Sequence, residues 1–197
     1  MPMDTAQPLP RSPELMNRDD SALLVVDMQV RLLPLICGHR RLVWNVRRLL
    51  DGARLLAVPA AGTEQYPQGL GSTAPELAPY LGTIPAKLAF SAGECGAVFS
   101  TWRDQGRWKI VVCGIETHVC VAQTVFDLLA EGFRVFVPVD AVGARHAVDH
   151  ETALRRLDSS GATLTTTEAT LFEWCARAGT PEFKGISQLV RELPPED

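Results

Sequence analysis

Residues 108–132 read WKIVVCGIETHVCVAQTVFDLLAEG, and this stretch decides the fold. Its first part, WKIVVCGIE, is an apolar and β-branched run of the kind that forms a strand buried on both faces. The second part, THVCVAQTVFDLLAEG, places apolar residues on one face of a helix, and Gly132 follows at a position typical of a helix end. A buried strand followed by an amphipathic helix is the repeating unit of parallel α/β sheets.

The same alternation extends from this stretch in both directions. Before it come a predicted buried strand, SALLVVDM (21–28), an amphipathic helix (39–56), a strand weakened by Pro59, LLAVPAAG (55–62), and a short helix closed by Gly106, GAVFSTWRDQG (96–106). After it come the strand FRVFVPVDAV (133–142), the helix HAVDHETALRRLDSSG (146–161), the strand ATLTTT (162–167) and a last helix containing ISQLVREL (186–193). This order predicts an α/β fold, a three-layer α/β/α arrangement with a central parallel sheet, Rossmann-like and in a single domain.

Composition narrows the class of protein. A chain of 197 residues with 46% hydrophobic and 21% charged residues suits one packed globular domain. The formal net charge of -4 argues against a nucleic-acid partner, which requires a basic surface. Pro and acidic residues stand where a signal peptide needs an apolar run, and no stretch is long enough to span a membrane, so we predict a cytoplasmic protein without a membrane partner.

Two further predictions concern the cysteines and the N-terminus. The five cysteines form an odd set without a CxxC pair, which indicates free thiols in a reducing compartment and neither a disulfide framework nor a zinc knuckle. Four prolines fall within the first twenty residues. We therefore predict a flexible arm over residues 1–18, disordered or draped over a partner subunit, and a single folded domain over residues 19–197.

Cys120 is the first candidate for chemistry. The segment GIETHVC places it in the first turn of a helix that leaves a buried strand, where unpaired N–H groups and the helix dipole favour a thiolate and lower the thiol pKa from about 8.5. The same N–H groups could bind an oxyanion. The alternative is that Cys120 is a small buried hydrophobic residue, as most free cysteines are.

Asp27 and Lys87 are the other two candidates. Asp27 ends the first predicted strand, so in a parallel sheet it emerges at the edge from which the Cys120 helix departs, and it could accept the thiol proton. A strand-end carboxylate is also a common structural cap. Lys87 lies in the apolar segment IPAKLAF, where a lysine either extends to solvent or meets a negative partner.

Four segments together resemble the isochorismatase-like hydrolase superfamily, in its cysteine hydrolase branch. They are, in order, SALLVVDMQ, TEQYPQGLG, KLAFSA and GIETHVCV, and they span residues 21–121. The resemblance implies a catalytic triad of Asp27, Lys87 and Cys120. It also implies a cis peptide bond between Ile115 and Glu116, and an oxyanion hole formed by the backbone N–H groups of Glu116 and Cys120.

Two departures from other branches of that superfamily are informative. Nicotinamidase-type members bind a metal through an aspartate and histidines after the second strand, whereas this chain has TEQYPQGLG there and its four histidines elsewhere. We predict no catalytic metal and no cofactor. Members that hydrolyse the vinyl ether of isochorismate lack the nucleophilic cysteine, which this chain has, so the family name does not give the substrate.

The resulting functional prediction is a hydrolase for a small-molecule substrate. Cys120 would attack an amide-like C–N bond and form a thioester, in a protein that is a homo-oligomer as the family usually is. Flanking residues predicted for the substrate pocket, at Gln65, Tyr66, Phe90 and His118, could equally be loop and core packing, and His118 is a wall residue rather than the base. One alternative is another bond at the same site, an ester, carbamoyl group or thioester. A second is a non-enzymatic assembly or binding protein, in which iodoacetamide would modify Cys120 no faster than Cys37.

Overall fold

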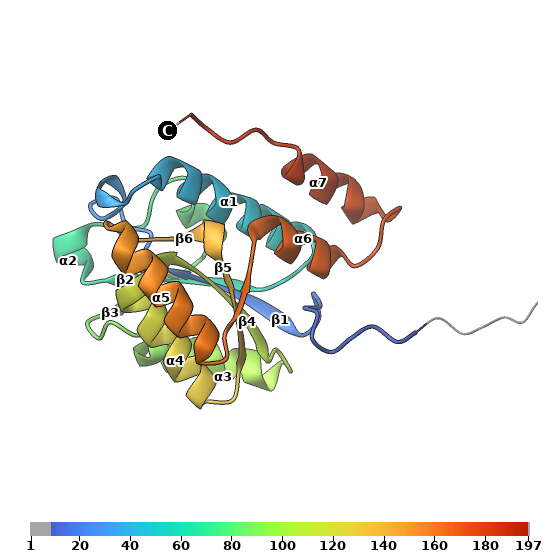
Figure 1. Cartoon of the computed structure of the whole chain (residues 1–197), viewed down its shortest axis with the longest axis horizontal. Coiled ribbons are helices and arrows are strands. Elements are labelled where there is room, and N and C mark those ends of the chain that lie inside the picture. Colours follow the sequence, from blue (N-terminus) through green and yellow to red (C-terminus); the bar gives the residue numbers. More distant parts are fainter. Residues whose placement is uncertain (1–8, 197) are drawn as a thin grey trace, which may run out of the picture.

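A parallel sheet of seven strands forms the middle layer of the molecule (Figure 1). The computed structural model describes residues 9–196. The strand order is β3-β2-β1-β4-β5-β7, and β6 pairs with β4 beyond the end of β5. The strands are β1 (Ser21–Val26), β2 (Ala60–Gln65), β3 (Ala86–Lys87), β4 (Lys109–Ile115), β5 (Arg134–Pro138), β6 (Val142–Gly143) and β7 (Thr163–Thr165). Every one of these pairings is parallel, as the alternating sequence pattern predicts.

Helices cover both faces of the sheet and complete the three predicted layers (Figure 1). On one face lie α1 (His39–Leu55), α6 (Thr167–Cys175) and α7 (Pro181–Val190), and on the other lie α3 (Gly96–Asp104), α4 (Ala122–Ala130) and α5 (Ala147–Ser159). Each face of the sheet has its own hydrophobic core, and alternate residues of β1 point into one or the other. Leu23 and Val25 pack under α1, while Leu24 and Val26 pack under α4. Because both faces are buried, the strand is a continuous apolar run without alternation.

The structure differs from the prediction in three elements. The strand predicted over residues 55–62 is displaced toward the C-terminus, because α1 continues to Leu55 and β2 begins only after Pro59, which has no N–H to donate. The strand predicted over residues 133–142 is broken after Pro138 by a 3-10 turn, Val139–Ala141. Helix α6 was missed, although the Thr166 side chain caps it by accepting from the N–H of Ala169.

The predicted N-terminal arm is described by the structure from residue 9 onward, and residues 1–8 lie outside the described part. Met16 is fully buried in the core beneath α1 and α6. Its N–H donates to Glu173 on α6 at 2.8 Å, and the Arg11 side chain donates to two backbone oxygens, those of Met16 and Glu173. The second half of the arm is therefore packed against the domain.

A search of the helices in residues 9–196 finds none that is both long enough and apolar enough to cross a lipid bilayer.

Candidate active site

The candidate residues meet at the carboxyl edge of the sheet because four parallel strands end there together. In the strand register, Val26 of β1 lies beside Gly114 of β4, and Gln65 of β2 lies beside Lys87 of β3. Asp27 follows β1 directly, with φ of 52°, a left-handed conformation that Asp adopts more readily than most residues. This edge is where α/β sheets carry their ligand sites.

Asp27 and Lys87 form a fully buried ion pair. The distance from Lys87 Nζ to Asp27 Oδ2 is 2.7 Å, and neither side chain has any exposed surface. Lys87 Nζ also donates to Gln65 Oε1 at 2.6 Å and to the Phe90 carbonyl oxygen at 2.8 Å, while the Thr63 hydroxyl donates to Asp27 Oδ1 at 2.8 Å. The sequence allowed Lys87 either to extend to solvent or to meet a negative partner. In the structure its ammonium group is buried and paired with Asp27, so it does not extend to solvent.

Cys120 lies beside this pair on the turn that joins β4 to α4. Residues Thr117–Val121 form one turn of π-helix, so the helix predicted from residue 117 is regular only from Ala122. The thiol is buried, and its sulfur lies 4.0 Å from Gln65 Oε1. The peptide bond between Ile115 and Glu116 is cis.

Gly114 allows the strands to approach closely just before this turn. Its φ is 117°, and a Cβ atom at this position would lie 2.1 Å from the carbonyl oxygen of Val26. A side chain would therefore push β4 away from β1 and move the Cys120 turn relative to Asp27. This contact explains why the segment GIETHVC begins with glycine.

The protonation state of Cys120 differs from the expectation. Burial, with a smaller contribution from the negative charge of Asp27, raises the pKa of the thiol to about 12, and Lys87 only partly opposes this. The expected lowering by a helix N-terminus is wrong, because the cysteine is enclosed by protein and precedes the regular part of α4. The resting group at neutral pH is a thiol, so preferential alkylation of Cys120 over the exposed Cys37 is no longer expected.

We expect the alkylation of Cys120 by iodoacetamide to rise about tenfold for each pH unit between pH 7 and 9, without a plateau, because the thiolate fraction stays far below one. In the urea-denatured chain the rate for the same cysteine should bend toward a plateau, since a free thiol titrates near about 8.5. Peptide mass spectrometry gives both profiles. A plateau below pH 8 in the folded protein would show that the thiolate is preformed.

The residues predicted for the pocket wall lie in different surroundings. Gln65 is at the centre of the site, between Lys87 and Cys120. Phe90 contributes its carbonyl oxygen to Lys87, whereas its ring is half exposed, and Tyr66 is also half exposed, with its N–H on the Lys87 carbonyl oxygen. The His118 ring lies 3.8 Å from Asp149, and its Nδ1 atom is buried without a hydrogen-bond partner in the described chain.

Glu116 is held by a residue that the sequence did not single out. Its carboxylate is nearly buried and accepts from Arg145 three times, from the backbone N–H at 3.0 Å and from Nε at 3.1 and 3.2 Å. The next residue of the turn, Thr117, has its hydroxyl 3.0 Å from His150 Nδ1. The turn that carries Cys120 is therefore fastened to the start of α5 at two successive residues.

Two further supports were also missed. The side-chain amide of Gln29 forms two hydrogen bonds with the backbone of Gln65. It accepts from the Gln65 N–H at 2.8 Å and donates to the Gln65 carbonyl oxygen at 3.0 Å. The Thr124 hydroxyl donates to the Cys120 carbonyl oxygen at 2.7 Å and accepts from the Ala92 N–H at 2.8 Å. The only sequence signal for Gln29 is a polar residue directly after a buried strand.

No group of three or more His, Cys, Asp or Glu side chains suited to a metal ion occurs within residues 9–196. The donors that meet at Cys120 are one carboxylate, one ammonium, one amide and one thiol, and the carboxylate is already paired with the ammonium. Such a set suits proton transfer and nucleophilic attack.

Comparison with known proteins shows the family and the fold. Residues 21–169 match the family model "Isochorismatase domain". "Isochorismatase domain-containing protein 2" from Bos taurus is 41% identical over 181 residues, which cover 89% of this chain and 85% of the relative. A solved structure described as MAR1 ribonuclease from Caenorhabditis elegans superposes with a TM-score of 0.85 at 36% identity, covering 92% of this chain and 95% of that one. The YcaC product of Escherichia coli, described as an octameric hydrolase of unknown specificity, superposes with a TM-score of 0.82 at 26% identity, covering 91% of both chains.

Proposed function

The chain belongs to the isochorismatase family, and on that premise we propose that it is a cysteine hydrolase that cleaves a small amide-like C–N bond. The observation that carries this proposal is a buried thiol enclosed together with a buried carboxylate–ammonium pair. A carboxylate can take the thiol proton, and an ammonium can balance the charge that proton transfer redistributes. Cys120, Asp27 and Lys87 would then be the nucleophile, the general base and the charge-stabilising group.

Because the resting thiol is protonated, its proton must leave as the new bond forms. Asp27 takes the proton while the sulfur attacks the substrate carbonyl carbon, and the backbone N–H groups of Glu116 and Cys120 stabilise the oxyanion. When the tetrahedral intermediate collapses, the C–N bond breaks and the nitrogen takes the proton from Asp27. Water then adds to the thioester, again with Asp27 as base, and releases the carboxylic acid and the thiol.

The test is to trap the thioester. The protein is mixed with a panel of small primary amides, ureides and esters, quenched in acid within a turnover, and measured by intact mass. We expect an increase equal to the substrate mass minus that of the released amine, located on the peptide that contains Cys120. Esters trapped in preference to amides would identify the alternative bond, and turnover without any adduct would contradict the cysteine mechanism.

RNA is a second candidate substrate, because the Caenorhabditis elegans protein is described as a ribonuclease. The formal net charge of -4 disfavours a polyanion, since RNA binding gains its affinity from basic side chains. A single-stranded RNA oligonucleotide therefore belongs in the same panel. Its cleavage at equal rates by the parent and by a Cys120→Ala variant would point to chemistry elsewhere on the chain.

We also propose a homo-oligomer in a reducing, cytoplasmic setting. The assembly is supported by the octameric relative from Escherichia coli, and the reducing setting by five cysteines that all remain free thiols. The division into an arm over residues 1–18 and a domain over residues 19–197 remains a prediction. The buried Met16 favours a shorter free arm.

A further inference from the structure

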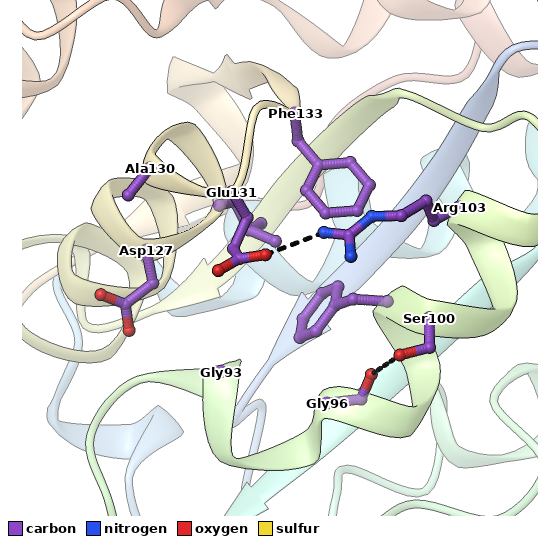
Figure 2. Close-up of a pocket in the computed structure, with 10 residues that line it drawn as sticks. Gly93, Gly96, Ser100, Arg103, Asp127, Ala130, Glu131 and Phe133 are labelled. Atoms are coloured by element: carbon purple, nitrogen blue, oxygen red, sulfur yellow. Dashed lines mark hydrogen bonds and ion pairs between the residues drawn. The ribbon is translucent and has the colours of Figure 1, made fainter.

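A pocket of about 390 Å³ lies between α3 and α4, away from the candidate active site (Figure 2). Neither Asp27, Lys87 nor Cys120 lines it. Its volume falls within the range of about 300–1,000 Å³ that is usual for small-molecule sites. The proposed hydrolase chemistry leaves this pocket without a role.

Two largely buried aromatic side chains are among the residues that line it. Phe99 comes from α3 and Phe133 from the segment after α4, and their ring centroids are 6.3 Å apart with the planes inclined by 60°. Leu128 adds an aliphatic side chain to the lining. A ligand that fills this space would place an apolar body against the rings.

The charged groups leave the pocket with one unbalanced negative charge. The guanidinium of Arg103 lies over the Phe133 ring, 5.2 Å from its centroid, and donates to Glu131 at 2.9 Å, so these two charges balance. Asp127 is exposed to solvent, and within residues 9–196 its carboxylate has no ion pair and no hydrogen bond. Figure 2 shows it on α4, apart from the Arg103–Glu131 pair. The free charge favours a cationic ligand.

Glycine keeps the opposite wall open next to this carboxylate. A Cβ atom at Gly93 would lie 3.2 Å from Asp127 Oδ2 and 3.1 Å from the Ser91 hydroxyl, so a side chain there would crowd Asp127. A Cβ atom at Gly96 would meet nothing within 4 Å. The Asp127 carboxylate thus lies close to Gly93, whereas a larger residue at position 96 has room to extend.

We propose that this pocket binds a small organic cation, an amine with a compact aromatic or aliphatic body. The ammonium group pairs with Asp127 and the body lies against Phe99 and Phe133. An ammonium beside a carboxylate and an aromatic face gains both Coulomb attraction and cation–π attraction. A carboxylate ligand would instead meet repulsion from Asp127, because Arg103 is already paired. The proposal does not depend on the hydrolase function.

The test is a series of three probes of similar shape and different charge, measured by titration calorimetry on the full chain in its native assembly. We expect 2-phenylethylamine to bind about tenfold more tightly than neutral 2-phenylethanol, and 3-phenylpropionate not to bind. Asp127→Asn should weaken binding of the amine up to about fivefold and leave binding of the alcohol unchanged. Asp158→Asn, an exposed carboxylate on α5, is the matched control and should bind the amine like the parent.

A second variant tests the location without changing charge. Gly96→Leu extends a side chain at the pocket wall, so it should abolish binding of both amine and alcohol while the thermal midpoint stays that of the parent. Three results would overturn the proposal: equal binding of amine and alcohol, unchanged amine binding in Asp127→Asn, or no binding in the parent.

Discussion

Replacing Cys120 by alanine or serine should abolish hydrolysis of any substrate found in the panel, lowering kcat/KM by at least about a thousandfold. Removing the nucleophile of a covalent hydrolase removes the acyl-enzyme route, and only binding and oxyanion stabilisation remain. Serine keeps the size of the side chain, but its hydroxyl is less acidic than the thiol whose pKa is already raised to about 12, and Asp27 is a weak base for it. The measurement is steady-state kinetics on each variant.

The matched control is Cys37→Ser, an exposed cysteine outside the site, which should retain the parent rate. Thermal unfolding of each variant separates a chemical loss from a folding loss. Because Cys120 is a small buried side chain, Cys120→Ser should unfold within a few degrees of the parent. Hydrolysis at the parent rate in a folded Cys120→Ala protein would mean that the thiol is not the nucleophile.

Local sequence patterns predicted which residues lie at the carboxyl edge of the sheet, but not which side chains contact one another there. The apolar runs that form β1 and β4 are continuous because both faces are buried, so their ends, and with them Asp27 and Cys120, could be placed on one edge. Lys87 belongs to a strand of only two residues, which is too short to show any periodicity. Its ion pair joins positions sixty residues apart, and only the three-dimensional register brings them together.

The sequence also led to a wrong expectation for the pKa of Cys120, again because it does not show three-dimensional surroundings. A position at a helix start is visible in the sequence, whereas the enclosure of that position is not, and here burial outweighs the dipole. The clamp between Glu116 and Arg145 was missed for a related reason. Both are ordinary charged residues in the sequence, and their role follows from the pairing of β6 with β4, which places the two segments side by side.

Breaking the buried ion pair should destabilise the protein as well as inactivate it. Lys87→Met keeps the length of the side chain but leaves the Asp27 carboxylate buried without its counter-charge, and removing one partner of such a pair typically costs about 3–5 kcal/mol. Asp27→Asn should lower kcat/KM by about 100- to 10,000-fold through loss of the base. Urea unfolding and steady-state kinetics measure the two effects separately.

The double variant Asp27→Asn with Lys87→Met tests whether the loss of stability comes from an unpaired buried charge, because it removes both charges. Its free energy of unfolding should lie above that of Lys87→Met alone, while its activity stays absent, since no residue replaces the base. Arg54→Met is the control, because its ion pair with Asp51 is exposed on the arginine side and should contribute less than about 1 kcal/mol. If the two single losses of stability simply added in the double variant, the pair would not be coupled, and Lys87 would not balance the charge of Asp27 in the resting site.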